Sequence, residues 1–176
     1  MKLDREYQVL ISEEELQKRI KELADQITKD YKDKNLFLVG ILKGAAPFMC
    51  ALMKHIDNDS LTMDFMSVSS YGNNEQSSGV VRLIKDLNQP IEGKDVLIVE
   101  DIIDTGNTLK FLTDLFSSRN PNSLKTVALF DKPKRREVDI NGDYIGFTIE
   151  DRFIFGFGLD YEERYRQIPY VLEVLN

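Results

Sequence analysis

The sequence has few of the features that secretion, membrane insertion or nucleic-acid binding require. Its single cysteine, Cys50, cannot form an internal disulfide, which suits a reducing cytosol. No apolar run approaches the roughly 18–20 residues of a membrane span, and the first residues carry acids and lack an apolar signal core. The net charge of −7 disfavours a broad basic surface for nucleic acid. We therefore expect a cytoplasmic protein with no membrane partner and no nucleic-acid partner.

The length and composition are those of one globular domain. The chain has 176 residues, of which 42% are hydrophobic and 30% are charged, and this length suffices for one substantial core. We find no internal repeat, low-complexity segment or interdomain linker. The sequence therefore predicts a single domain over residues 1–176.

Hydrophobic periodicity predicts strands that alternate with helices. Ser12 and Glu15 match a capping box in front of an amphipathic helix at 13–31. The other predicted elements are a strand at 36–42, a helix at 45–56, a strand at 61–70, a loop at 70–79, a strand at 80–87, a strand and helix within 96–118, strands at 123–130, 144–149 and 153–158, and a short strand or turn at 168–175. This alternation favours a parallel α/β sheet, and the helix-poor C-terminal part suggests a small cap beside it.

The most informative stretch is VLIVEDIIDTGNTL, residues 96–109. An apolar run leads directly into Glu100 and Asp101, and a third acid, Asp104, precedes the sequence TGNT, where Thr105 could cap a helix. Backbone N–H groups at such a helix start can bind phosphate. An ordinary polar connection would explain the helix start, but not three acids at the carboxyl end of a strand, where α/β sheets bind their ligands. The acids make sense if a divalent cation or sugar hydroxyls lie between them and a phosphate.

The sequence EDIIDTG at 100–106 resembles the phosphoribosyl pyrophosphate signature of the type I phosphoribosyltransferases, in the form of their hypoxanthine-guanine branch. Asn107 departs from the lysine often found at this place. The resemblance covers roughly residues 5–175 and implies a Rossmann-like parallel sheet flanked by helices. It also implies a core over approximately 30–150 and a small hood built from the N-terminal segment and approximately 150–176.

The resemblance also implies a role for each residue of this stretch. Glu100 and Asp101 are expected to bind the ribose hydroxyls, directly or through Mg²⁺. Asp104 is the expected catalytic base, facing N7 of the purine. The residues expected to hold the 5′-phosphate are Thr105, Gly106, Asn107 and Thr108.

Two further segments resemble the parts of this family that bind pyrophosphate and cover the site. Lys43 and Gly44 could form a simple capping turn, but the resemblance makes them a pyrophosphate loop with a cis peptide bond between Leu42 and Lys43. A non-proline cis bond costs about 2.5–4 kcal/mol, so it occurs where function or packing maintains it. Ser70 and Tyr71 could lie at an ordinary hairpin tip, whereas the resemblance makes them part of a mobile catalytic lid that keeps water out.

The purine site is expected after residue 130. Lys132 lies in the basic sequence KPKRR, which by itself reads as a solvated loop, and the resemblance makes it the donor to O6 of a 6-oxopurine. In FIFGFGLDYEERYR, Phe153 would stack on the purine, and the backbone of Ile154 would pair with the base edge. Asp160 would lie beside the base and reach a second Mg²⁺ through water, while the planar fork of Arg166 would hold pyrophosphate.

Several other residues have simpler interpretations. Phe155 and Phe157 are expected in the core, and Cys50 and His55 are expected to pack on an apolar helix. Asp64 lies inside an apolar strand, and the sequence alone indicates no role for it. The remaining basic residues of the KPKRR segment are expected to be surface charges: Lys134, Arg135 and Arg136.

The implied activity is the transfer of a phosphoribosyl group from phosphoribosyl pyrophosphate to N9 of hypoxanthine or guanine. The partners are then small molecules, and the family forms homodimers and homotetramers. Two alternatives stay open. One is a xanthine-guanine enzyme, and the other is a non-catalytic regulator that uses the same fold to sense nucleotides.

Overall fold

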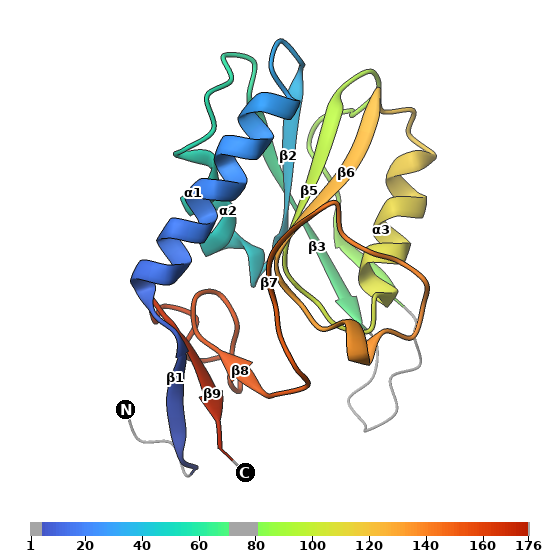
Figure 1. The fold of residues 1–176 in the computed structure, drawn as a ribbon. Helices are drawn as coiled ribbons and strands as arrows, with labels where there is room; N and C mark the ends of the chain where they lie inside the picture. The colour runs from blue at the N-terminus through green and yellow to red at the C-terminus, as the bar shows by residue number, and fades with distance from the viewer. Residues whose placement is uncertain (1–4, 71–80, 176) are drawn as a thin grey trace.

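A central twisted sheet organises the chain in the computed structural model, which describes residues 5–70 and 81–175 (Figure 1). The helices are α1 (Glu13–Asp30), α2 (Ala45–Met53), α3 (Asn107–Ser117) and the 3₁₀ turn η1 (Pro133–Arg135). The strands are β1 (Tyr7–Ile11), β2 (Leu36–Leu42), β3 (Thr62–Ser70), β4 (Val81–Lys85), β5 (Asp95–Ile103), β6 (Ser123–Asp131), β7 (Tyr144–Thr148), β8 (Ile154–Phe155) and β9 (Val171–Val174).

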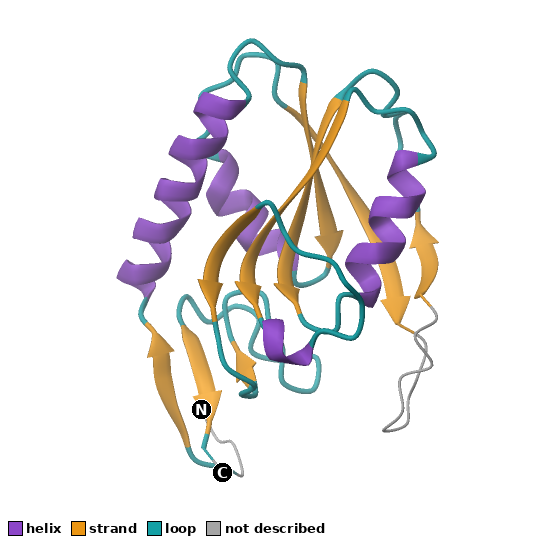
Figure 2. Cartoon of the chain, turned by 45° about the vertical axis from the view of Figure 1, so that its right-hand side comes forward, coloured by secondary structure: helices purple, strands orange, loops and turns teal. Residues whose placement is uncertain are grey.

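The main sheet has six strands in the order β4-β3-β2-β5-β6-β7. Strands β3, β2, β5, β6 and β7 run parallel, and β4 adds an antiparallel edge. The predicted parallel α/β sheet flanked by helices is therefore confirmed. Because the parallel strands point the same way, their carboxyl ends meet at one edge of the sheet. In Figure 2 this edge faces a second, smaller sheet formed by β1, β9 and β8.

Two hydrophobic cores cover the two faces of this sheet. Helices α1 and α2 pack on one face against residues such as Leu38 and Leu97, while α3 packs on the other face against Val39 and Ile98. Neighbouring residues of β2 and β5 thus point to opposite cores, as the two-residue period of a strand requires. This two-sided burial explains why these strands read as continuous apolar runs.

The predicted capping box at the start of α1 is confirmed. The backbone N–H of Glu15 donates to the Ser12 hydroxyl at 3.3 Å, and the backbone N–H of Ser12 donates to Glu15 Oε2 at 2.8 Å. Each side chain therefore satisfies a backbone donor that has no helical partner at this end.

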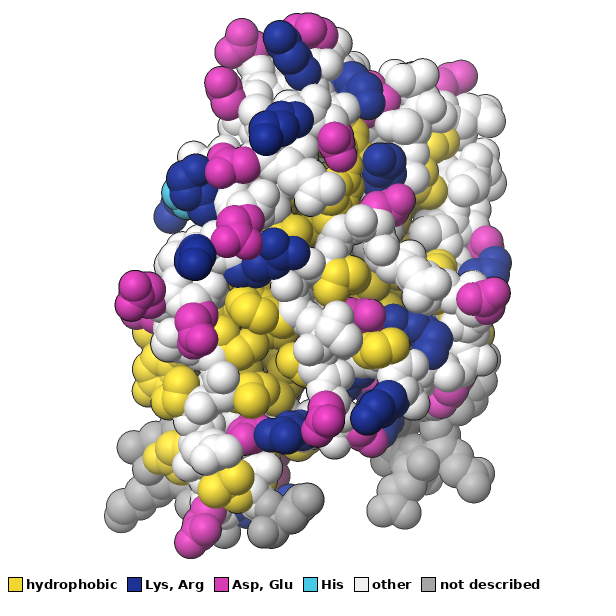
Figure 3. All heavy atoms as spheres, viewed as in Figure 1, with side chains coloured by type: hydrophobic (Ala, Val, Ile, Leu, Met, Phe, Trp, Pro, Cys, Tyr) yellow, Lys and Arg dark blue, Asp and Glu magenta, His cyan; other side chains and the backbone are white. Residues whose placement is uncertain are grey.

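The two ends of the chain meet in a second sheet with the order β1-β9-β8, in which all pairs are antiparallel. Figure 3 shows hydrophobic side chains gathered between the lower end of α1 and this sheet, with charges of both signs interspersed over the rest of that face. None of the described helices is both long and apolar enough to cross a membrane.

Some predicted boundaries and packing roles are wrong. The helix expected at 45–56 ends at Met53, and the chain continues in turns with shorter-range bonds, such as His55 N to Leu52 O at 3.1 Å. Cys50 and His55 are exposed rather than packed: Cys50 lies on the side of this short helix that is not buried, and His55 lies in the turns beyond its end. The strand expected at 153–158 ends at Phe155, because the next three residues all adopt positive φ, from 47° to 99°.

Candidate functional site

The predicted site residues converge on the carboxyl edge of the main sheet. Lys43 and Gly44 follow β2, Glu100 and Asp101 lie in the last half of β5, and Lys132 follows β6. Strand β5 pairs with both β2 and β6, so these three segments are neighbours in space although they lie far apart in the sequence. This edge is where open α/β sheets bind ligands.

Glu100 is buried and Asp101, next to it, is half-buried. Burial, together with the neighbouring Asp101 charge, holds the pKa of Glu100 well above its usual value. Burial raises the pKa of Asp101 to about 6, although its hydrogen bond from the Ile102 N–H at 2.9 Å and the charge of Arg166 act in the opposite direction. In the described residues neither carboxylate forms a salt bridge. A bound cation or hydroxyl donors of a ligand would stabilise the ionised forms of two such adjacent carboxylates.

The loop after β2 lies directly against this acidic pair. A Cβ added to Gly44 would lie 1.5 Å from Asp101 Oδ2, so any larger residue would displace that carboxylate. A Cβ at Gly158 would lie 2.1 Å from the Gly44 backbone oxygen, which places the C-terminal segment against the same loop. The peptide bond between Leu42 and Lys43 is cis, as predicted.

The loop before α3 has a different cap from the predicted one. The N-cap is Gly106 with φ 87°, not Thr105, because the sharp entry into the helix needs a left-handed residue. The Thr105 hydroxyl accepts only a long bond from the Asn107 N–H, at 3.4 Å. The backbone N–H groups of the first turn, which includes Thr108, have no intrahelical partner and are available to an anion.

The segment after β6 packs against this loop and is hydrogen-bonded to it. Asn107 Nδ2 donates to Glu137 Oε2 at 2.8 Å, and the Glu137 N–H donates to the Thr105 backbone oxygen at 2.9 Å. A Cβ at Gly106 would come within 3.0 Å of Arg136, Val138 and Ile140 side-chain atoms. Gly106 is therefore required both by its conformation and by this close packing.

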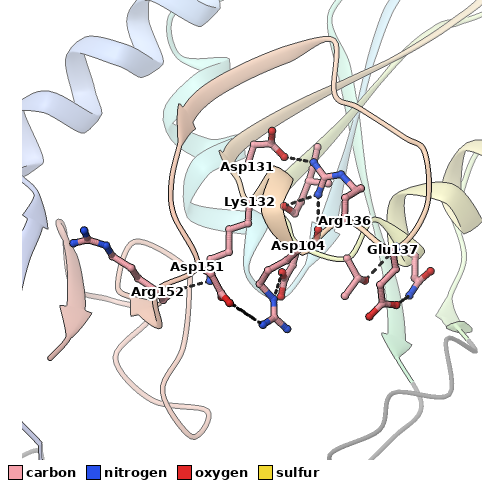
Figure 4. Close-up of polar contacts among 11 residues, drawn as sticks. Asp104, Asp131, Lys132, Arg136, Glu137, Asp151 and Arg152 are labelled. Atoms are coloured by element: carbon pink, nitrogen blue, oxygen red, sulfur yellow. Dashed lines mark hydrogen bonds and ion pairs between the residues drawn. The ribbon is translucent and has the colours of Figure 1, made fainter. Parts of the chain in front are cut away.

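Asp104 begins this loop and contacts the basic segment after β6 (Figure 4). Its carboxylate is 41% exposed, and Oδ1 accepts a hydrogen bond from Arg135 Nε at 2.7 Å. Arg135 is at the surface, as predicted, but it has this specific partner. The prediction that Arg136 is a surface charge is wrong: its guanidinium is largely covered, donates to backbone oxygens of the loop and of Ile140, and pairs with Asp131.

The predicted purine-binding residues also lie together. Lys132 is 8% exposed, burial lowers the pKa of its ammonium group, and Nζ donates to the Arg152 backbone oxygen at 2.6 Å. The next residue, Phe153, is 53% exposed and meets Tyr161 edge-on at 5.5 Å between ring centroids. Ile154 begins β8 and is buried, as Phe155 and Phe157 are. The site thus offers an aromatic face beside a shielded ammonium group.

The predicted pyrophosphate-binding cations are joined by an acid that the sequence did not single out. Glu163 lies 2.6 Å from Lys43 Nζ and 3.4 Å from Arg166 Nη2. Arg166 also pairs with Asp160 at 2.8 Å and donates to the Gly158 oxygen at 2.8 Å. Glu163 could not be found from hydropathy, because its position follows from the left-handed backbone of this turn.

Two predicted features fall outside this cluster. Ser70 ends β3, and Tyr71 lies outside the described residues, so the lid stays a prediction. Asp64 has a structural explanation: its carboxylate accepts the N–H groups of Asn88 and Phe65 at 2.6 and 2.7 Å, which ties β3 to the segment after β4. Within residues 5–70 and 81–175, no group of three or more His, Cys, Asp or Glu residues could hold a metal ion by itself.

Comparison with known proteins matches the phosphoribosyl transferase domain to residues 11–162. The chain is 55% identical over 163 residues to a hypoxanthine-guanine phosphoribosyltransferase of Bacillus subtilis (strain 168), covering 93% of this chain and 90% of the relative. A crystal structure of a hypoxanthine phosphoribosyltransferase from Staphylococcus aureus is similar with a TM-score of 0.91 and 53% identity, over 96% of this chain and 91% of the other. A hypoxanthine-guanine phosphoribosyltransferase from Bacillus anthracis has a TM-score of 0.91 and 46% identity, over 98% and 100% of the two chains.

Proposed function

The chain belongs to the phosphoribosyl transferase family, and we propose that it transfers the 5-phosphoribosyl group of phosphoribosyl pyrophosphate to N9 of hypoxanthine, and also of guanine. The products are the purine nucleotide, IMP or GMP, and pyrophosphate. The observation that carries the proposal is the convergence of three kinds of group on one edge of the sheet. These are a phosphate-binding helix start, an acidic pair for the sugar, and an exposed aromatic ring beside a shielded ammonium group.

The sugar phosphate is bound at both ends. The loop from Thr105 to Thr108 binds the 5′-phosphate through backbone N–H groups, helped by the positive end of α3. Glu100 and Asp101 accept hydrogen bonds from the 2′- and 3′-hydroxyls. With both ends fixed, the anomeric carbon is held in one place, so much of the entropy of reaction is lost on binding rather than at the transition state.

The acidic pair also fits Mg²⁺. Both carboxylates have raised pKa values and lack a salt-bridge partner in the described part of the chain, so a divalent cation would stabilise their ionised forms. Mg²⁺ commonly takes one or two carboxylates together with substrate phosphate oxygens, which suits a site without three protein ligands. Asp160 would hold a second ion through water. When bound, the metal neutralises charge that develops on the leaving pyrophosphate.

The purine lies on Phe153, with the backbone of Ile154 and the carboxylate of Asp160 at its edge. The Lys132 ammonium group exchanges its hydrogen bond from the Arg152 oxygen to O6 of the purine. Asp104 accepts the proton at N7 as N9 forms its bond to the sugar. General acid–base help of this kind is typically worth about 10²–10⁴ in rate.

Lys43, the Gly44 backbone and Arg166 receive the pyrophosphate. Their pairs with Glu163 must open for this, because the same donors cannot serve the carboxylate and the phosphate oxygens together. Ser70 and Tyr71 would then close over the site and keep water away from the cationic transition state.

Ultraviolet monitoring of hypoxanthine with phosphoribosyl pyrophosphate and Mg²⁺ tests the proposal. We expect nucleotide formation that depends on the metal and is reduced by Asp104→Asn, and competition between hypoxanthine and guanine would rank the two bases. Efficient use of xanthine would instead indicate the xanthine-guanine alternative, and nucleotide binding without turnover would indicate a regulator. Light scattering of the same preparation would test the expected homodimer or homotetramer.

A further inference from the structure

The basic segment after β6 is fixed relative to the loop that carries Asp104. The Lys132 N–H donates to the Ile103 oxygen at 2.9 Å, and the Glu137 N–H donates to the Thr105 oxygen at the same distance. Both sides of the 3₁₀ turn η1 are thus hydrogen-bonded to the loop after β5. Residues between these two anchors have a defined position relative to the loop.

Arg136 strengthens this attachment from a buried position. Its side chain is 11% exposed. It donates to the backbone oxygen of Ile103 at 3.1 Å, to that of Ile140 at 3.0 Å and also to that of Asp104, and it pairs with Asp131. A buried guanidinium is stable only when such acceptors surround it. Arg136 therefore holds the main chain at Asp104 in place.

Arg135, the preceding residue, reaches the side chain of the same aspartate. Its Nε donates to Asp104 Oδ1 at 2.7 Å, whereas its Nη1 is 3.4 Å from both oxygens of Asp151. The charge of Asp104 is also the main cause of a raised pKa for the Arg135 guanidinium. Among the described residues, Oδ2 of Asp104 accepts no hydrogen bond, so one oxygen is held and the other is available (Figure 4).

This one-sided contact is useful to a general base. A carboxylate on a surface loop can rotate about its side-chain bonds, and a hydrogen bond to one of its oxygens limits that rotation. The guanidinium bound to Oδ1 restrains the carboxylate and leaves Oδ2 available to take up a proton. Lys134, one residue earlier, is exposed and makes no such contact in the described structure.

We propose that Arg135 is a positioning residue that orients the Asp104 carboxylate for proton transfer, while Arg136 fixes the backbone below it. The proposal rests on the proposed function, because it needs Asp104 to be the base. It gives a role in the reaction to two arginines of a segment that reads, by composition, as solvated surface. Arg135 itself does not touch the purine in this account.

Four single variants and one double variant test the proposal: Arg135→Gln, Arg135→Lys, Lys134→Gln, Asp104→Asn and the combination of Arg135→Gln with Asp104→Asn. We expect Arg135→Gln to lower kcat roughly 3- to 30-fold, a part of the effect of a positioned base, with the KM for phosphoribosyl pyrophosphate nearly unchanged. Arg135→Lys should retain more of the wild-type kcat than Arg135→Gln does. Lys134→Gln removes one positive charge at the neighbouring position and should behave as the wild type. Thermal unfolding of each variant verifies that it is folded.

The double variant separates positioning from a general electrostatic or structural role. If Arg135 acts through Asp104, its loss adds nothing once the base is absent, so the double variant should match Asp104→Asn. Multiplied losses, or an Arg135→Gln enzyme as active as Lys134→Gln or more so, would overturn the proposal while Asp104 stays the base. Full activity of Asp104→Asn would instead remove the proposed base, and the role of Arg135 with it.

Discussion

Replacing Asp101 by asparagine should make the free protein more stable at neutral pH. Burial raises the pKa of this carboxyl from the usual 3.8 to about 6, so its ionisation in the folded state opposes folding. A difference of this size corresponds to roughly 3 kcal/mol above pH 6. Because the side chain is only partly covered, we expect roughly 1–3 kcal/mol. Asparagine has nearly the same shape, and its oxygen can still accept the Ile102 N–H.

The sign of this effect depends on pH. Below about pH 4 the carboxyl is protonated in both the folded and the unfolded protein, so it does not oppose folding. Between about pH 4 and 6 the unfolded chain has lost this proton while the folded protein still holds it, so stability falls as the pH rises through this range and stays at its lower level above about pH 6. The advantage of Asp101→Asn should therefore be greatest near pH 7.5 and at least halved near pH 4.5.

Urea unfolding of the metal-free protein in the presence of a chelator would measure this difference at each pH. Asp59→Asn is the matched control, because Asp59 is an exposed carboxylate at the opposite end of the sheet from the site. Adding Mg²⁺ with phosphoribosyl pyrophosphate should then stabilise the wild type, by about 2.7 kcal/mol at a hundred times Kd, and the Asp101 variant less. A variant that is less stable than the wild type near pH 7.5, or a difference that does not change with pH, would show that ionisation of this carboxyl does not oppose folding.

Three further substitutions have expected outcomes. Lys132→Ala should raise the KM for hypoxanthine roughly tenfold or more, because O6 loses a charged donor, and steady-state kinetics with an unchanged KM would contradict the assignment. Glu163→Gln frees the two cations that it pairs with, so calorimetry should find pyrophosphate bound roughly two- to fivefold more tightly, unlike the exposed control Glu162→Gln. Ser12→Ala removes the cap of α1 and should cost about 1 kcal/mol of unfolding free energy, without an effect on kcat.

The sequence predicted the fold well where local pattern and final burial agree. Strand 36–42 and the helix from residue 13 were found because their apolar periods match the two cores, and the Ser12 capping box marked a helix start that the structure retains. The strand expected at 153–158 was wrong because left-handed residues interrupt it, including Phe157, whose type gives no sign of positive φ.

The positions of most site residues followed from topology. Residues that end neighbouring parallel strands must share an edge, so finding Asp101 near Lys43 and Lys132 needed only the correct strand order. The ion pairs of Arg135 and Glu163 could not be predicted in this way. These pairs depend on loops whose path is set by tertiary contacts. The sequence alone does not distinguish which charged residue of such a run forms the ion pair.

The most direct measurement is a crystal structure of the protein with IMP, pyrophosphate and Mg²⁺. We expect the 5′-phosphate on the backbone of residues 105–108, the ribose hydroxyls beside Glu100 and Asp101, and the base over Phe153. A nucleotide bound at any other place, with these groups left to solvent, would contradict the proposed function.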